Sequence, residues 1–100
     1  MRILLPMDSR DEEEAKLTKL EDVKVWCQLN IEEGEVKETL FADTKEEFEE
    51  FSECVVVTND KEYVWPFMEL SMLVLVAHTQ RYIEDIVEAY IFKELHDLAY

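Results

Sequence analysis

Three short, continuous apolar runs constrain the fold of this chain more than any other feature of its sequence. They occupy residues 3–5, 54–57 and 72–77, and each is followed by polar residues. Apolar runs of this length without polar alternation are typical of strands that are buried on both faces, as in a parallel sheet. The sequence therefore predicts an α/β domain built around three parallel strands.

The segment between the first two runs has a different pattern. Apolar and polar residues alternate over residues 23–31, and this period of two marks a strand with one apolar face. The Glu-Glu-Gly-Glu sequence at 32–35 provides a tight turn in which Gly34 can adopt positive φ. Residues 36–41 form the returning strand. These segments predict an antiparallel hairpin at one edge of the sheet.

Two short helices are expected on either side of the second apolar run. The first begins at Asp43 or Thr44, which can cap it, and places Phe48 and Phe51 on its inner face. The second occupies one or two turns within residues 63–71, where a proline is tolerated only in the first turn.

The third predicted helix is the longest and closes the chain. Thr79 is a suitable N-cap for it. Apolar residues at helical spacing form its inner stripe: Ile83, Ile86, Val87, Tyr90, Leu95 and Leu98.

Taken together, these segments predict one α/β domain over residues 1–100 with a three-layer arrangement. Right-handed crossovers place the second and third apolar runs successively beside the first, and the hairpin lies on the other side. The expected architecture is a five-stranded mixed sheet of order 3-2-1-4-5 with an antiparallel hairpin and three helices. Residues 8–22 form an acidic connecting loop.

The charge of the chain limits its partners. Its 25 acidic and 10 basic residues give a formal net charge of −15 at pH 7. Such a charge repels phosphate backbones and anionic lipid headgroups, so direct binding to nucleic acid or membranes is disfavoured. The N-terminal residues do not form a secretory signal, and no apolar stretch is long enough to span a membrane. We therefore expect a cytoplasmic protein whose partner is another protein.

A binding site in an open α/β sheet is expected beyond the carboxyl ends of its parallel strands. The candidates at that edge are Asp8, Asn59, Asp60 and His78. Two carboxylates and an imidazole could coordinate a divalent cation, although helix caps and turns use the same residue types. No serine or cysteine has a histidine and an acid placed to activate it. The sequence predicts neither catalytic residues nor a resident metal or cofactor, so we expect a protein that is not an enzyme.

The cysteines and tryptophans are interpreted mainly as core residues. Cys27 and Cys54 lie inside apolar strand-like runs, where a free cysteine usually behaves as a small buried hydrophobe. Their number and spacing fit neither a disulfide framework nor a zinc site. Trp26 and Trp65 could mark a binding surface, but tryptophan is usually mostly buried, so packing in the core is favoured for both.

Three segments of the chain are similar to segments of one known family. Residues 1–8, MRILLPMD, resemble its opening strand, typically MKIAVPVD. Residues 29–36, LNIEEGEV, resemble its IVDIEDGEI hairpin, and residues 79–90, TQRYIEDIVEAY, resemble its closing helix, commonly TVEEAIEAY. The family is that of dinitrogenase iron-molybdenum cofactor biosynthesis (NifX/NifB-type domains). The resemblance spans nearly the whole chain and implies a ribonuclease H-like architecture.

The segments with which that family binds its cluster precursor are different in this chain. Counting back from the hairpin turn, the histidine, phenylalanine and glycine of the family's S-x-H-F-G segment fall at Lys19, Leu20 and Glu21. The family's G-G-x-G-P loop is replaced by residues 58–66, which retain only the proline. The resemblance therefore implies a fold, and no binding residue is carried over.

Three functional hypotheses follow. The leading one is a small acidic accessory or interaction protein in which the cluster-binding motif is lost. The second is a carrier of an iron-sulfur or iron-molybdenum precursor with different ligands, drawn from Cys27, Cys54 and His78. The third is a metal-dependent enzyme that uses Asp8, Asp60 and His78 at the carboxyl edge of the sheet.

Overall fold

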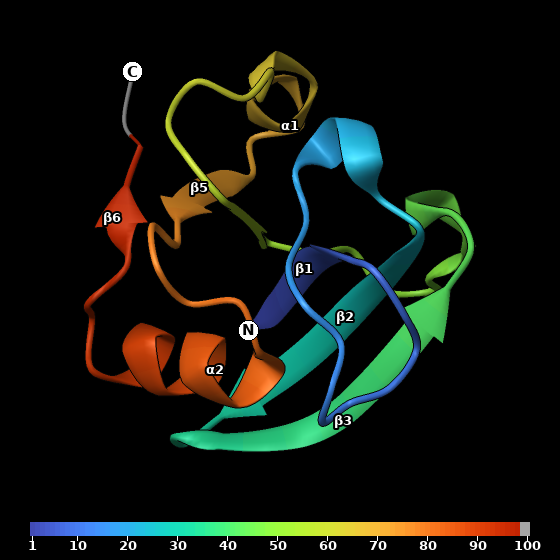
Figure 1. Ribbon diagram of the computed structural model, residues 1–100, viewed down its shortest axis with the longest axis vertical. Coiled ribbons are helices and arrows are strands. Elements are labelled where there is room, and N and C mark those ends of the chain that lie inside the picture. Colours follow the sequence, from blue (N-terminus) through green and yellow to red (C-terminus); the bar gives the residue numbers. More distant parts are fainter. Residues whose placement is uncertain (99–100) are drawn as a thin grey trace.

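A mixed sheet of six strands forms the centre of the computed structural model, which describes residues 1–98. The strands are β1 (Arg2–Met7), β2 (Val25–Glu32), β3 (Glu35–Ala42), β4 (Cys54–Val57), β5 (Leu73–Val76) and β6 (His96–Asp97). The α-helices are α1 (Trp65–Glu69) and α2 (Ile83–Ile91), and two 3-10 turns are η1 (Leu20–Asp22) and η2 (Lys45–Glu47). Figure 1 shows the β2–β3 hairpin at one side of the sheet and β6 at the other.

The strand order, β3-β2-β1-β4-β5-β6, begins with the predicted order of the first five strands. β1 pairs in parallel with β4, and β4 with β5, whereas the other pairs are antiparallel. Neighbouring residues on the central strands point to opposite faces: Leu5 and Val56 belong to the core on one face, and Leu4 and Val55 to the core on the other. The apolar runs therefore fill two cores at once, which explains their lack of polar alternation.

Both faces of the sheet are covered, as expected for an α/β domain. On one face the cover is α2, which contributes Ile83 and Ile86, together with residues of the loop after β1. On the other face it is α1, whose Phe67 lies 6.3 Å from the Trp26 ring, measured between centroids. Neither helix within residues 1–98 is long and apolar enough to cross a membrane. The assignment to the ribonuclease H-like architecture stays a prediction.

The prediction of a helix after Asp43 or Thr44 was wrong. This segment forms only η2, a single 3-10 turn, and the chain is extended again at Phe48. The extended course is fixed by the side chain of Gln28, whose Nε2 donates a hydrogen bond of 2.8 Å to the Glu50 carbonyl oxygen. This bond ties the backbone at Glu50 to the sheet. The first of the three predicted helices is therefore replaced by a 3-10 turn and a segment that is neither helix nor strand.

The long closing helix was predicted correctly only in its middle. It begins at Ile83 instead of directly after Thr79, because the preceding residues pair with the loop after β1. In that pairing the Leu17 N–H donates a 2.7 Å hydrogen bond to the Arg81 carbonyl oxygen. The helix ends at Ile91, and the chain turns back to add β6 to the sheet.

The sixth strand changes the positions of several residues that were expected on the closing helix. Leu95 packs against the core that α2 covers, whereas Leu98 packs against the core on the opposite face. His96 pairs with Val76 of β5. The described sheet therefore has six strands where five were predicted, and two α-helices where three were predicted.

Both α-helices end in Schellman motifs whose left-handed residue is not glycine. In α1 the Met72 N–H donates to the Phe67 carbonyl oxygen, and Ser71 has φ of 61°. In α2 the Glu94 N–H donates to the Ala89 carbonyl oxygen, and Lys93 has φ of 59°. Glycine usually occupies this position, because side chains are strained there. The usual sequence signal for a helix end is therefore missing from both helices.

At a position with positive φ, stability should rise when a side chain is removed and fall when one is added, because only the side chain causes backbone strain there. We expect Ser71→Gly to raise the free energy of unfolding by up to about 1 kcal/mol, because the strain at φ 61° is removed. Gly34→Ala should lower it by about 1 kcal/mol. A methyl group at Gly34 meets no atom within 4 Å, so that loss comes from the backbone at φ 76° alone. Urea denaturation of both variants checks the two opposite shifts.

Candidate functional site

The predicted site residues do lie after the parallel strands, and two of them hydrogen-bond to the backbone of their own loops. The carboxylate of Asp8 accepts the backbone N–H of Lys16 at 2.8 Å, and the Asn59 side-chain oxygen accepts that of Lys61 at 2.8 Å. Asp60 is exposed in the turn after β4. Within residues 1–98, no three His, Cys, Asp or Glu side chains are grouped closely enough to hold a metal ion. The residues follow β1, β4 and β5 as expected for that edge, but the three proposed metal ligands do not converge within the described chain.

His78 has a neighbour that the sequence did not indicate. Its ring lies 6.0 Å from the ring of His96, because β6 returns beside β5. Both side chains are exposed at the edge of the sheet. The two imidazoles form a pair, and no carboxylate in the described part of the chain completes a group of three potential metal ligands with them.

Glu62 organises the carboxyl edge, although the sequence did not single it out. Its carboxylate accepts hydrogen bonds from the N–H and the hydroxyl of Thr58, at 2.7 and 2.6 Å. It also accepts the N–H of Leu20 at 2.5 Å. One carboxylate thus closes the loop after β4 and holds the η1 segment against it. The only sequence signal was a threonine at a strand end with a glutamate four residues later.

The two segments that differ from the resembled family face each other at this edge. Residues 19–21, Asn59 and residues 61–63 line an open pocket of about 540 Å³. Its charged side chains are of both signs: Lys19, Glu21, Lys61 and Glu62. The pocket therefore carries no concentrated charge of one sign with which to hold an anionic or a cationic ligand.

The two thiols lie away from this edge and are fully buried. Cys27 is in the middle of β2, and Cys54 is the first residue of β4, at the amino end of that parallel strand. Desolvation by burial raises the pKa of each thiol to about 12, and nearby carboxylates add to the effect, Glu12 at Cys27 and first Asp97 at Cys54. The thiolate is the form that binds metals, so both side chains are held in the form that does not.

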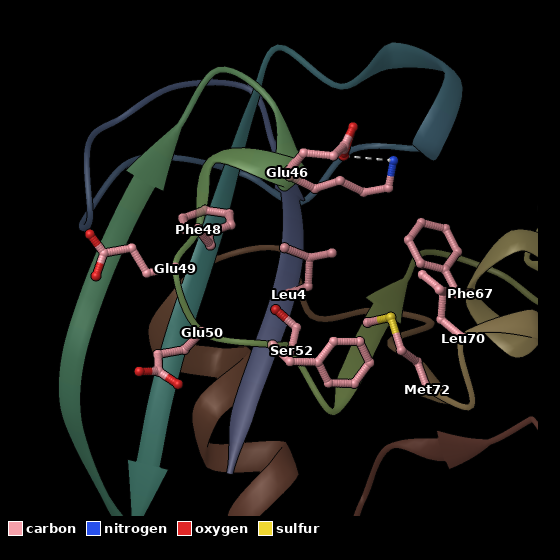
Figure 2. A pocket seen from close by; sticks show the side chains of 11 residues that line it. Leu4, Glu46, Phe48, Glu49, Glu50, Ser52, Phe67, Leu70 and Met72 are labelled. Atoms are coloured by element: carbon pink, nitrogen blue, oxygen red, sulfur yellow. Dashed lines mark ion pairs between the residues drawn. The ribbon is translucent and has the colours of Figure 1, made fainter.

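A second pocket, more apolar than the first, opens on the α1 face of the sheet (Figure 2). Its volume is about 380 Å³. Leu4 of β1 lies at its floor, with Phe48 on one side and Phe67 of α1 on the other. Two apolar residues that line it are largely exposed: Phe51 at 57% and Leu70 at 53%. Exposed apolar side chains around an apolar cavity are typical of a binding surface.

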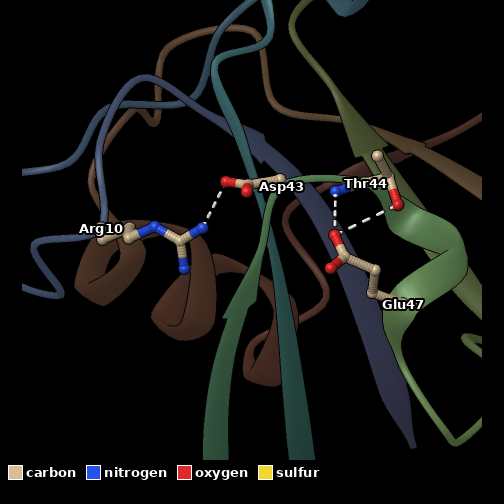
Figure 3. A network of polar contacts seen from close by, with 4 residues as sticks. All are labelled: Arg10, Asp43, Thr44 and Glu47. Atoms are coloured by element: carbon tan, nitrogen blue, oxygen red, sulfur yellow. Dashed lines mark hydrogen bonds and ion pairs between the residues drawn. The ribbon is translucent and has the colours of Figure 1, made fainter.

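The η2 turn at the entrance to this pocket is held by polar contacts, shown in Figure 3. The Glu47 carboxylate accepts the backbone N–H of Thr44 at 2.7 Å and the Thr44 hydroxyl at 3.2 Å. Just before the turn, Asp43 pairs with Arg10 from the loop after β1. These groups are exposed, so the contacts mainly fix the position of the turn and contribute little to stability.

The segment after η2, which forms one wall of the pocket, is held in place by the buried side-chain amide of Gln28. Gln28 is 3% exposed and lies beside Leu4 in the sheet. Its Nε2 donates to the Glu50 carbonyl oxygen and to the Ser52 hydroxyl, both at 2.8 Å. The segment that carries Phe48 and Phe51 is thereby tied to the sheet. The position of the pocket wall therefore depends on Gln28.

Three glutamates lie on the η2 side of the pocket, away from α1 (Figure 2). Glu46, Glu49 and Glu50 line it and are exposed. Lys45 is the one cationic residue among its lining residues, and its ammonium group pairs with Glu46 at 3.2 Å. Within residues 1–98, the side chains of Glu49 and Glu50 make no ion pair or hydrogen bond. The rim of the pocket therefore has a net negative charge.

The sequence predicted part of this site. Phe48 is half-buried, as an inner residue should be, but Phe51 is exposed, contrary to the prediction. Trp26 is in the core as expected, whereas Trp65 is 55% exposed, which corrects its assignment to the core. Nothing in the periodicity of residues 45–52 indicated that they would form a single 3-10 turn followed by a non-helical segment beside the pocket.

Solved structures with the same fold share little sequence with this chain. A crystal structure of a protein from Methanocaldococcus jannaschii described as a "putative dinitrogenase" (MJ0327) has a TM-score of 0.77 at 18% identity, covering 99% of this chain and 95% of that one. The crystal structure of PH0822 has a TM-score of 0.74 at 17% identity, with coverage of 98% and 96%. No protein-family model and no curated protein matches the sequence. The likeness establishes a dinitrogenase-like fold and says nothing of activity.

Burial of the thiols should make them unreactive in the folded protein. At pH 8 we expect Ellman's reagent to label neither Cys27 nor Cys54 until a denaturant is added, because both pKa values are raised to about 12. The raised values also predict a pH dependence. The thiols stabilise the fold fully below their ordinary pKa of 9.0, and this contribution is lost as the pH rises from 9.0 towards 12. The double variant Cys27→Ala/Cys54→Ala should lose less stability over that range, and rapid labelling of the native protein would contradict the prediction.

Removing the Gln28 amide should loosen the wall of the apolar pocket. In Gln28→Ala the Ser52 hydroxyl and the Glu50 carbonyl oxygen lose their donor, at an expected cost of about 1–3 kcal/mol in the free energy of unfolding. Hydrogen exchange should accelerate mainly in residues 48–52. Ser52→Ala serves as the control, since it keeps the bond to Glu50 and should produce a smaller change. Uniform acceleration along the chain would show that Gln28 has no local role.

Proposed function

We propose that this chain is a small acidic accessory protein, cytoplasmic and not an enzyme, that acts by binding another protein. Its dinitrogenase-like fold is established by its structural neighbours. The cluster-binding motif of the resembled family is, in this proposal, lost. The observation that carries the proposal is the apolar pocket on the α1 face, with Phe51 and Leu70 exposed at its rim.

The composition of this pocket supports a protein partner. Interfaces between proteins have an apolar centre and a polar rim, and the pocket has the same organisation. Sites for small molecules generally contain a few polar groups that fix the orientation of the ligand. Here the charged lining residues, Lys45 and three glutamates, belong to the rim. The one uncharged polar side chain is that of Ser52, and its hydroxyl already accepts a hydrogen bond from Gln28.

The residues of the chain do not fit the cluster of the resembled family. The places of the family's histidine and phenylalanine hold Lys19 and Leu20, and the η1 turn that contains Leu20 is tied to Glu62. Both thiols are buried, and desolvation raises the pKa of each to about 12. His78 is exposed and lies beside His96, but within residues 1–98 the two histidines belong to no group of three potential metal ligands. These observations support the loss of cluster binding.

Site-specific crosslinking tests whether the pocket is the contact surface. We expect Leu70→p-benzoylphenylalanine, irradiated in cells of the native host, to yield one discrete crosslinked product. Phe92→p-benzoylphenylalanine is the matched control, since Phe92 is 69% exposed at the end of α2, which covers the opposite face. The protein trapped at Leu70 should also bind the purified chain, and Phe51→Ser should weaken that binding.

Two results would overturn the proposal. Equal products from the Leu70 and Phe92 positions, or none from Leu70, would mean that the pocket is not the contact surface. Stoichiometric iron with charge-transfer absorption in the anaerobically purified protein would identify a cluster carrier instead.

A further inference from the structure

The charge around the apolar pocket specifies the chemistry of its occupant. Glu49 and Glu50 line the pocket with exposed carboxylates that make no ion pair within the described residues. The ammonium group of Lys45 is paired with Glu46 and contacts the Trp26 ring, with its Nζ 5.9 Å from the centroid. The one cation at the entrance is thus held back against the protein, and the two carboxylates face outward.

We propose that the pocket binds a lysine- or arginine-rich segment of a partner protein that inserts one apolar side chain as an anchor. This inference rests on the proposed function and names the partner's chemistry. The anchor contacts Leu4, Phe48 and Phe67, which form the inner wall of the pocket. The flanking cations lie beside Glu49 and Glu50. The apolar contact provides the affinity, and the charges select the partner and speed its association.

The net charge of the whole chain also favours a cationic partner segment. A net charge of −15 attracts cationic segments from a distance and repels acidic ones, including a second copy of the chain itself. The exposed Phe51 and Leu70 add apolar surface on which an anchor can seat. A neutral hydrophobic ligand would make no use of the unpaired carboxylates. An acidic partner would place like charges opposite them, at a cost in free energy.

Fluorescence anisotropy with defined peptides tests this inference on the full chain. The probe is a labelled synthetic peptide of lysine and serine with a single central leucine. The reference peptide has alanine in place of that leucine. We expect only the leucine peptide to bind appreciably, with an affinity that falls as salt is raised. Leu70→Ser should weaken it about fivefold or more, whereas Phe92→Ser should leave it unchanged.

A pair of charge variants separates local recognition from general attraction. Glu49→Gln/Glu50→Gln should weaken peptide binding about threefold to tenfold. Glu12→Gln/Glu13→Gln removes the same charge from an exposed loop that does not line the pocket and should have a much smaller effect. Equal losses in the two variants, or equal binding of the leucine and alanine peptides, would overturn the inference.

The test also distinguishes failure of this inference from failure of the proposed function. If crosslinking at Leu70 identifies a partner whose contact segment is acidic or neutral, the accessory role stands and the basic-segment inference is overturned. If the lysine-leucine peptide binds with the predicted dependence on Leu70, Glu49 and Glu50, the chemistry of the surface is supported independently of which host protein uses it.

Discussion

Burial of the central strands on both faces is the constraint on which the rest of the structure depends. Val55 and Val56 of β4 are fully buried but belong to cores on opposite sides of the sheet. Each face must therefore be covered by another layer. On one side α2 and the loop after β1 provide this cover. On the other side α1 has only five residues and is about 7.5 Å long, whereas neighbouring strands are about 4.8 Å apart. It covers β1 and β2 only in part, where Phe67 packs with Leu4 and Trp26, and residues 45–52 cover part of what remains.

The apolar pocket is a consequence of this incomplete cover. It lies between the short helix and residues 45–52, over Leu4. Longer cover on this face would have buried Phe51 and Leu70, which are instead exposed. The pocket persists because Gln28 and the Thr44–Glu47 contacts hold its outer wall in place. Polar groups at fixed positions thus maintain an apolar surface that hydrophobic collapse alone would tend to close.

The two candidate sites show how little the position of a site in a fold reveals about function. The carboxyl edge is where ligands bind in many open α/β sheets, and in this chain it holds an open pocket of mixed charge organised by Glu62. The apolar pocket lies on a face of the sheet instead. The structural neighbours cover 98–99% of the chain at 17–18% identity, and a likeness this remote concerns the fold alone. Function is therefore inferred from local chemistry: the buried thiols, the apolar lining and the unpaired carboxylates.

The sequence by itself determined the first five strands and their order. Unbroken apolar runs identified β1, β4 and β5, and alternation with Gly34 identified the β2–β3 hairpin, because these patterns directly reflect which faces are buried. Helix ends, the sixth strand and the site were decided only by tertiary structure. Lys93 and Ser71 end helices without the usual glycine, and Gln28 ties residues 48–52 to a distant part of the chain. The hydrogen bonds of the Glu62 carboxylate and the exposure of Phe51 also depend on contacts between distant parts of the chain. Such contacts leave no periodic pattern in the local sequence.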